Sequence, residues 1–321
     1  MKYIDVPYTQ LHVSQICLGS TDIGASISVR DSFALMDEFV ARGGNFIDTA
    51  HVYSDWIPNT KSTSEKTIGQ WLKARSNRNQ IVLATKGAHP DLATMHVPRL
   101  SPAEIVQDLT ESLDYLQTDV IDLYFLHRDH RSIPVGEIID VLDEQVRAGR
   151  IRYLGASNWS IPRIQEAVDY GKRTGKHTLI ANQPLWSLAV PNLALHFDQT
   201  LIAMDAAGME FHRRTQMLAV AYSSQARGFF SKMDATGQRA IGKDDWVLFN
   251  NQANFKRLER CRELSRKHGV AINDVVLAYL LSQPFPTVPI IGSKRLDQLH
   301  SSLKALDLTL TPDELAYLEA N

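Results

Sequence analysis

Short apolar runs alternate with longer amphipathic stretches along the chain. Eight of the runs have the length of strands and are bounded by polar residues, a pattern that indicates strands buried on both faces. They lie near residues 15–19, 45–49, 80–85, 121–126, 151–156, 178–182, 217–222 and 287–291. Because each run is followed by an amphipathic stretch, the pattern predicts an α/β fold of the (β/α)8 TIM-barrel type.

Helix signals support this alternation. Ser101 to Glu104 combines a capping serine, a first-turn proline and an acidic third position, which together predict a helix start. Ile138, Val141, Leu142 and Val146 recur at helical spacing in the next stretch.

Three segments lie outside the simple repeat. Lys2 to Ser14 has the pattern of a short β-hairpin before the first barrel strand. Two helical stretches, Asn254 to His268 and Asn273 to Ser282, both precede the last strand, so one of them must be additional. The stretch from Ser223 to Ala253 is interpreted as a long loop in which Gly228 and Gly237 supply flexibility.

Composition places the chain among ordinary globular proteins. The 321 residues include 44% apolar and 22% charged residues, and no Pro/Gly/Ser-rich linker divides them, so we expect one domain over residues 1–321. A net charge of −2 gives no reason to expect nucleic acid or a membrane surface as a partner.

The cysteines and the chain start point to the cytoplasm. Cys17 and Cys261 lie in a strand-like and a helical pattern, as expected of buried thiols in a reducing compartment. Met1 to Asp5 has no basic region followed by an apolar core, which argues against a secretory signal. No apolar stretch approaches the roughly 20 residues needed to span a bilayer.

Four chemically active side chains follow three of the predicted strands. Asp48 lies at the end of the second strand and Tyr53 just past it, while Lys86 follows the third strand and His127 the fourth. The carboxyl ends of the strands form the catalytic face of a parallel barrel, so these side chains should meet there. A phenol can protonate a carbonyl oxygen, a nearby ammonium makes that proton easier to release, and a carboxylate keeps the ammonium charged and in place.

The same residues carry a family resemblance. A lone tyrosine after a strand is usually structural, and an Asp–Lys pair is more often a surface ion pair. Here, however, three motifs occur together in the order and at the spacing of a known family: Asp48-Thr-Ala-x-x-Tyr53, Thr85-Lys86-Gly87 and Leu126-His127-Arg128. In these motifs the chain resembles the aldo-keto reductases, from Lys2 to its last helix.

The resemblance implies a fold and a reaction. The fold is a (β/α)8 barrel whose N-terminal hairpin closes the bottom. The reaction is NADP(H)-dependent reduction of a small aldehyde or ketone to an alcohol, or the reverse. It implies that Tyr53 supplies the proton, that Lys86 and Asp48 assist it, and that His127 orients the carbonyl oxygen. The residues suggest no metal site.

The cofactor site must differ from that of a Rossmann fold. No Gly-x-Gly-x-x-Gly follows a predicted strand. Barrels commonly hold phosphate in the loops after strands seven and eight, and here the eighth strand leads into Gly292, Ser293, Lys294 and Arg295. Such a run alone is mostly an ordinary helix start, but in this position it is expected to contact the cofactor.

The resemblance supplies further cofactor positions. It implies that Ser157, Asn158 and Gln183 hold the nicotinamide carboxamide, which needs donors and acceptors, and that Tyr222 stacks on the nicotinamide ring. Without the resemblance, Tyr222 is equally well a core aromatic. The remaining positions pass along the cofactor after the first strand or in the 223–253 stretch: Gly19, Ser20, Thr21, Ser223, Gln225 and Gly228.

The adenosine end departs from the family pattern. Many members carry an arginine for the 2′-phosphate and a Glu-Asn pair for adenine, where this chain has Gln298, Ser301 and Ser302. Lys294 and Arg295 can replace the lost cation, because a 2′-phosphate mainly requires positive charge and donors. NADP is therefore favoured, with NAD as the alternative.

Aromatic residues after several strands are candidates for the substrate rim. They are Trp56, His89, Trp186 and either Phe229 or Phe230, and loop packing explains such residues equally well. The chain ends soon after its last helix, which suggests an open pocket without the long C-terminal loop of the steroid-handling relatives.

A second class of function fits the same motifs. Some relatives bind NADP tightly and serve as regulatory or structural subunits with slow turnover. The four active residues argue against a purely structural role, and turnover with a panel of aldehydes would separate the two hypotheses. Nothing in the sequence determines the oligomeric state.

Overall fold

The computed structural model describes residues 1–320, and its centre is a closed barrel of eight parallel strands. The strands are β3 (Cys17–Gly19), β4 (Phe46–Asp48), β5 (Val82–Gly87), β6 (Ile121–Leu126), β7 (Ile151–Ser157), β8 (Leu179–Gln183), β9 (Leu218–Ala221) and β10 (Thr287–Ile291). They follow one another in chain order, and β10 pairs with β3 to close the barrel. Each lies within two residues of its predicted bounds, so the predicted (β/α)8 architecture is confirmed.

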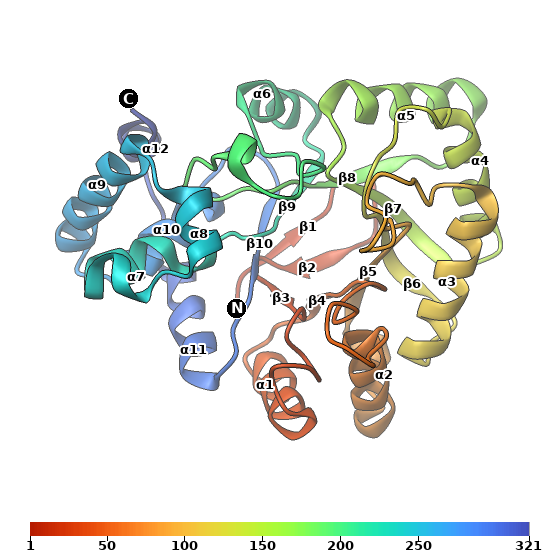
Figure 1. Ribbon diagram of the computed structural model, residues 1–321, viewed down its shortest axis with the longest axis horizontal. Helices are drawn as coiled ribbons and strands as arrows, with labels where there is room; N and C mark the ends of the chain where they lie inside the picture. Colours follow the sequence, from red (N-terminus) through yellow and green to blue (C-terminus); the bar gives the residue numbers. More distant parts are fainter. Residues whose placement is uncertain (321) are drawn as a thin grey trace.

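Helices surround the barrel, as Figure 1 shows. The helices that pair with the barrel strands in the repeat are α1 (Val29–Ala41), α2 (Thr63–Arg75), α3 (Pro102–Leu116), α4 (Val135–Arg147), α5 (Ile161–Thr174), α6 (Ala206–Thr215), α10 (Ile272–Leu281) and α11 (Leu296–Lys304). The predicted start of α3 is present: Ser101 and Glu104 form a reciprocal capping box. In α4 the predicted apolar stripe at Ile138, Val141 and Leu142 is buried.

The N-terminal hairpin consists of β1 (Tyr3–Asp5) and β2 (His12–Ser14), which pair antiparallel. Its apolar residues Val6, Leu11 and Val13 belong to the same core cluster as the side chains that fill the barrel. The Ser14 amide donates to the side chain of Asn45, just before β4 begins. The hairpin therefore covers the end of the barrel at which the strands start.

The segment after β9 corrects one expectation. Residues 223–253 were expected to form a long loop, but they contain α7 (Phe229–Thr236), α8 (Lys243–Phe249) and the short 3-10 helices η3 (Ala226–Gly228) and η4 (Gly237–Ala240). Phe229, Phe230, Leu248 and Phe249 are buried in a cluster with residues of α10, which provides the reason for helix formation. Gly228 and Gly237 have positive φ and mark helix ends.

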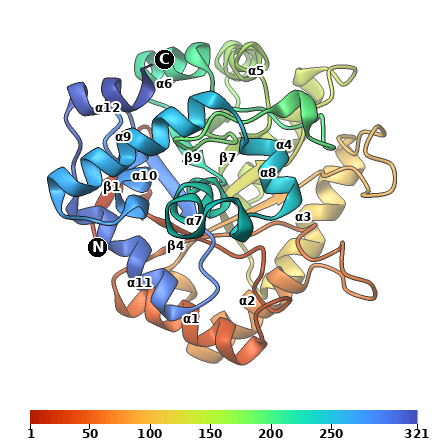
Figure 2. The ribbon, with the colours of Figure 1, turned by 60° about the vertical axis from the view of Figure 1, so that its left-hand side comes forward.

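Two further helices pack outside the repeat. They are α9 (Gln252–His268), which confirms the additional helix expected before the last strand, and α12 (Pro312–Glu319). Both lie on the same side of the molecule as α7 and α8 (Figures 1 and 2), and α9 packs on α10 and α12. No helix within residues 1–320 is long and apolar enough to cross a membrane. Cys17 and Cys261 are both buried and unpaired.

Candidate active site

Strand register brings the four predicted catalytic side chains to one end of the barrel. Asp48 is the last residue of β4, Lys86 is the second-last of β5, and His127 follows β6 directly. Backbone pairing continues past the strand ends, since the His51 amide donates to the Lys86 carbonyl and the His127 amide to the Gly87 carbonyl, both at 2.9 Å. These bonds fix the loop that carries Tyr53 next to β5.

Lys86 contacts two of the other three predicted catalytic residues, Asp48 and Tyr53. Its Nζ lies 2.6 Å from Asp48 Oδ2, 2.6 Å from the Thr49 carbonyl oxygen and 3.1 Å from the Tyr53 hydroxyl. The ammonium donates all three of its hydrogens in these contacts. Because it donates to the phenol oxygen, the phenol's own proton is left to point elsewhere. The structure thus brings together Asp48, Tyr53 and Lys86 as the sequence predicted.

Charge is retained at Lys86 although the side chain is buried. Burial alone would lower the pKa of Lys86, but Asp48 and Tyr53 outweigh it and leave the pKa raised above its ordinary value. The side chains of Lys86 and Asp48 are each only 1% exposed, so water screens this pair very little. Asp48 Oδ1 accepts a further hydrogen bond from Gln183 Nε2 at 2.9 Å, which fixes the carboxylate on its second oxygen.

His127 completes the group as a neutral ring. Burial, followed by the neighbouring His89, Arg128 and Lys86, lowers the pKa of His127 well below its ordinary value. Its ring packs edge-on against Tyr53 at 6.1 Å between centroids. Within residues 1–320 its Nδ1 is buried without a hydrogen-bond partner, so Nε2 is the nitrogen at the cavity.

A cavity of about 850 Å³ opens above Tyr53 and His127. Its walls are largely apolar, formed by side chains from the loops after several barrel strands. The apolar and aromatic lining residues are Trp56, Leu92, Met95, Leu185, Phe197, Leu201 and Tyr222. Trp56 and His89, both predicted as substrate contacts, line this cavity. A cavity of this size can hold a small substrate beside a planar ring that stacks on the side chain of Tyr222.

Sequence reasoning missed one polar wall of the cavity. Arg128 donates to Asp198 Oδ2 at 3.0 Å, to Thr200 Oγ1 at 2.7 Å and to the His127 carbonyl at 2.9 Å. This links the loop after β6 to the segment between β8 and α6. Arg128 directly follows the His127 motif and was visible in sequence, but its partners lie about seventy residues further along the chain.

Trp186 does not reach the cavity, which corrects its predicted place on the rim. It is 5% exposed and stacks on Phe285 at 5.8 Å, with Tyr279 edge-on at 6.3 Å. Phe229 and Phe230, the first two residues of α7, are likewise buried in the core, each 1% exposed. All three aromatics belong to one buried cluster with residues of α9 and α10.

The residues predicted to hold a carboxamide lie side by side at the ends of β7 and β8. The Ser157 hydroxyl donates to the Gln183 carbonyl at 2.9 Å. Asn158 is already saturated by the protein: its amide donates to Ser157 and the His127 carbonyl, and its oxygen accepts from Ile202 N and the Tyr222 hydroxyl. Gln183 uses its amide nitrogen on Asp48, so within the described residues its oxygen remains unused.

Gly19, Ser20 and Thr21, at the end of β3 and directly after it, have different surroundings. Ser20 is fully buried and bonded to the Asp48 carbonyl and to Ser64, so its hydroxyl serves the protein. Thr21 is exposed. Gly19 packs closely on β10, and a Cβ there would lie 2.6 Å from the Ile290 side chain. Of this group only Thr21 offers a side chain to solvent.

Two of the predicted cofactor residues, Gln225 and Ser302, meet beside Asn273, which was not predicted as a site residue. Gln225 donates to Asn273 at 2.8 Å and to the Ser302 hydroxyl at 3.1 Å. Asn273 lies in the first turn of α10, so α10, α11 and the segment after β9 meet here. Ser223 takes a left-handed φ of 54°, which turns the chain sharply after Tyr222.

The loop after β10 has features of an anion site. A Cβ at Gly292 would meet nothing within 4 Å, so the backbone is open there. The Ser293 hydroxyl is buried and has no hydrogen-bond partner within residues 1–320. The cations that follow are exposed and already paired: Lys294 lies 2.8 Å from Asp22, and Arg295 forms a two-pronged contact with Asp297. Gln298 accepts from the Lys294 amide.

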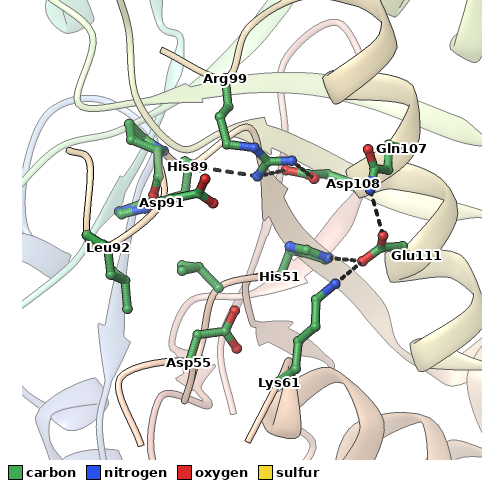
Figure 3. A pocket seen from close by; sticks show the side chains of 13 residues that line it. His51, Asp55, Lys61, His89, Asp91, Leu92, Arg99, Gln107, Asp108 and Glu111 are labelled. Carbon is green, nitrogen blue, oxygen red and sulfur yellow. Dashed lines mark hydrogen bonds and ion pairs between the residues drawn. The ribbon is translucent and has the colours of Figure 1, made fainter. Parts of the chain in front are cut away.

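Figure 3 shows a second, polar cavity of about 510 Å³. His89 and Leu92 line both this cavity and the first. On one wall Glu111 accepts from both His51 at 2.9 Å and Lys61 at 2.7 Å. Its charged side chains are therefore largely paired with one another. Among the described residues, no group of three or more His, Cys, Asp or Glu is placed to hold a metal ion.

Comparisons with known proteins find a matching family model and several relatives. Residues 15–321 match the model of the Aldo/keto reductase family. An uncharacterised oxidoreductase, YrpG, of Bacillus subtilis is 32% identical over 99% of this chain and 95% of its own length. The NADP(+) aryl-alcohol dehydrogenase of Phanerodontia chrysosporium is 29% identical over 97% of this chain and 83% of its own. Norsolorinic acid reductase B of Dothistroma septosporum is 28% identical over 98% and 79%.

A solved structure supports the fold independently. The crystal structure of a thermostable aldo-keto reductase with the inhibitor epalrestat superposes with a TM-score of 0.75. It covers 99% of both chains at 23% sequence identity.

Proposed function

Since the chain belongs to the aldo/keto reductase family, we propose that it is an NADP(H)-dependent oxidoreductase that reduces aldehydes or ketones to alcohols, or catalyses the reverse. One observation carries the proposal. Lys86 Nζ bridges the Asp48 carboxylate and the Tyr53 hydroxyl at 2.6 and 3.1 Å, and Tyr53 lines the apolar cavity. A structural ion pair has no need of a phenol between itself and a cavity.

Tyr53 acts as the proton donor in this proposal. Its hydroxyl accepts from Lys86, so its own hydrogen is free to point at a carbonyl oxygen in the cavity. The positive charge of Lys86 stabilises the phenolate that remains after the proton has left. Asp48 holds the ammonium in position, and Gln183 and the Thr49 carbonyl keep both partners from rotating.

His127 positions the carbonyl oxygen. Because its pKa lies well below the ordinary value, the ring is neutral and can donate one hydrogen bond without adding a positive charge beside Lys86. A donor fixed before the reaction stabilises the developing charge on oxygen without reorganisation. The largely apolar surface of the cavity strengthens these contacts.

The residues present fit a nicotinamide dinucleotide. The hydroxyl of Ser293, buried without a partner, and the open backbone at Gly292 suit a phosphate group, while Gln183 and Ser157 suit the carboxamide. Tyr222, at the cavity wall, would support the flat ring. When bound, the reduced cofactor supplies the hydride for the carbonyl carbon.

NADP is proposed over NAD. Lys294 and Arg295 directly precede α11 and are exposed, so a 2′-phosphate can replace Asp22 and Asp297 as their partner. The Phanerodontia chrysosporium relative is likewise an NADP(+) enzyme.

The cavity favours substrates with an apolar body. Most of the surface that lines it is apolar, and Trp56 remains 52% exposed at the rim. An aromatic aldehyde or ketone would bury its ring against this lining. The aryl-alcohol activity named for one relative agrees with this choice.

The variant Tyr53→Phe tests the proposal. It keeps the ring and removes the proton donor, so carbonyl reduction should fall by roughly 10²–10⁴-fold. Cofactor binding, followed by fluorescence titration, should be retained, because the ring and its neighbours are unchanged. A variant that reduced its best aldehyde at more than half the parent rate would show that Tyr53 is not the donor.

A further inference from the structure

One wall of the catalytic cavity is a segment without regular secondary structure. Residues 196–201 lie between the 3-10 helix η2 (Leu193–Leu195) and Ile202, and all six line the cavity together with Tyr53 and His127. The segment belongs to the connection from β8 to α6, whereas Tyr53 and His127 follow β4 and β6. A carbonyl compound with a bulky body therefore contacts this segment, while a small aldehyde held at Tyr53 and His127 needs little of it.

Hydrogen bonds to the backbone hold this segment at its two ends. Before it, the Asn192 amide donates to the Leu248 carbonyl at 2.7 Å. After it, the Ile202 amide donates to Asn158 Oδ1 at 3.1 Å, and the Ile202 carbonyl accepts from the Leu185 amide at 3.0 Å. Since the six residues between these points form neither a strand nor a helix, their position depends on side-chain contacts.

Arg128 holds the middle of the segment. Its Nη2 donates to Asp198 Oδ2 at 3.0 Å, and its Nε donates to Thr200 Oγ1 at 2.7 Å. The same guanidinium donates through Nη1 to the His127 carbonyl at 2.9 Å. Because its three nitrogens lie in one rigid plane, Arg128 fixes the distance between the segment and the backbone of His127.

This tie is single and buried. Within the part of the chain that the structure describes, no other hydrogen bond or ion pair joins 196–201 to a residue outside 192–202. The side chains of Arg128 and Asp198 are 9% and 11% exposed, so water cannot readily replace either partner. Burial alone would raise the pKa of Asp198, but Thr200 and Arg128 outweigh it and hold that pKa below its ordinary value. The carboxylate therefore stays charged, and the tie persists, at neutral pH.

We propose that Arg128 is a positioning residue for the substrate: it holds the 196–201 segment against the body of bulky carbonyl compounds, so that the enzyme prefers them over small aldehydes. The inference rests on the proposed function. Phe197 shows why the position of the segment matters. Its ring lines the cavity, is 84% exposed and stacks on His196 at 4.4 Å between centroids, so it presents a supported apolar face that a large substrate can cover. Without Arg128 that face has no fixed place.

Steady-state kinetics with two aldehydes of different size test this inference. Asp198→Asn removes the charge that Arg128 holds but keeps the shape of the side chain. KM for 2-naphthaldehyde should rise about tenfold, the effect of weakening one charge-assisted hydrogen bond. KM for propanal, and kcat for both aldehydes, should stay within about twofold, because the lost contact binds ground state and transition state equally. Asp198→Glu, which restores the carboxylate, should recover part of the affinity for 2-naphthaldehyde.

A second buried ion pair on the same loop provides the matched control. Asp129 directly follows Arg128 and pairs with Arg163 at 3.2 Å, with side chains 12% and 8% exposed. Neither Asp129 nor Arg163 is among the residues that line the cavity. Asp129→Asn should also lower the stability measured by urea unfolding, but it should leave both KM values near those of the parent. A merely structural role of Arg128 predicts the same kinetics for Asp198→Asn as for Asp129→Asn.

Chymotrypsin cleavage reports the position of the segment without any turnover, because this protease cleaves after large apolar residues such as Phe197. Arg128→Met leaves the sequence around Phe197 unchanged but frees the segment. Cleavage after Phe197 should become at least about fivefold faster, because it follows the population of the open segment. Arg163→Met should not accelerate it. If Arg128→Met does not fold, Arg128→Lys takes its place, since lysine keeps the charge but has one nitrogen for three acceptors.

Two kinetic results would overturn the inference and leave the proposed function standing. They are an unchanged KM for 2-naphthaldehyde in Asp198→Asn, and equal rises in KM for both aldehydes. Unchanged cleavage after Phe197 in the Arg128 variant would overturn it as well. No turnover of any carbonyl compound by the parent would overturn the proposed function, and the substrate role of Arg128 with it.

Discussion

Two charged corners of the barrel mouth contain similar residues in opposite environments. At the β4–β5 corner, Lys86 and Asp48 pair with side chains that are each 1% exposed. At the β10–α11 corner, Lys294 pairs with Asp22 at 53% and 33% exposure, and Arg295 with Asp297 at 64% and 68%. Both corners hold a cation against a carboxylate at hydrogen-bond distance.

The difference in exposure decides what each corner can do. A buried pair has no water to replace a lost partner, so its geometry is enforced and its charge acts strongly on a neighbouring phenol. An exposed pair is screened and contributes little, so its cation can exchange a carboxylate for another anion. The buried corner suits chemistry, and the exposed corner suits reversible binding of a phosphate.

The largest effect is expected from breaking the buried pair with Lys86→Met. Asp48 would remain buried without its cation, which costs about 3–5 kcal/mol in the free energy of unfolding. Carbonyl reduction should fall at least about a hundredfold, because Tyr53 loses the charge that favours proton release. Urea unfolding and cofactor oxidation measure the two losses, with exposed Lys73→Met as the control. Unchanged stability and activity would show that Lys86 is incidental.

A buried carboxyl group that has no cationic partner among the described residues is the opposite case to Asp48, which pairs with Lys86. Glu65 is fully buried and accepts from the Thr85 hydroxyl, and burial raises its pKa from 4.5 to about 7. The folded state therefore keeps a proton that the unfolded state loses near pH 4.5. Stability from this group is present below that pH and is lost as pH rises through about 7, by roughly 3 kcal/mol.

Glu65→Gln tests this sign, because glutamine cannot ionise. Between pH 5 and pH 8 the parent should lose more stability in urea unfolding than the variant does. Parallel losses in the two proteins would mean that Glu65 does not titrate in this range.

A smaller effect is expected from the exposed cations. Replacing both Lys294 and Arg295 with alanine should weaken NADPH about tenfold more than NADH, since only NADPH carries the 2′-phosphate. Fluorescence titration of both cofactors against parent and double variant measures the selectivity. Equal losses for the two cofactors would remove these residues from 2′-phosphate recognition.

The smallest effect is expected from the carboxylate partner in the exposed corner. Asp297→Ala frees Arg295 from a pair in which both side chains are exposed, so the midpoint of urea unfolding should not change measurably. NADPH affinity should rise slightly at low salt and return to the parent value at high salt, because screening removes the difference. A clear loss of stability would contradict the contrast between the corners.

The buried corner was predictable from sequence for a physical reason. Strands buried on both faces leave continuous apolar runs, and the residues that end these runs must meet at one end of a parallel barrel. Asp48, Lys86 and His127 each end or follow such a run, so their meeting was foreseeable. The same logic located all eight strands within two residues.

The parts that escaped prediction depend on contacts between distant segments. The 223–253 stretch forms α7 and α8 because its phenylalanines pack on α10, and that partner cannot be read from the local pattern. Trp186 follows β8 as a rim residue would, but its ring stacks on Phe285 in the core. The pair Arg128–Asp198 joins two loops whose proximity only the folded barrel creates.

The central claim is that the buried corner delivers a proton to a carbonyl group. The most direct test is multiple-turnover oxidation of NADPH, with NADH in parallel, by the parent protein against a panel of aromatic and aliphatic aldehydes and ketones. We predict oxidation that depends on the carbonyl compound and proceeds faster with NADPH than with NADH. Tight cofactor binding without carbonyl-dependent oxidation of either cofactor would contradict the claim.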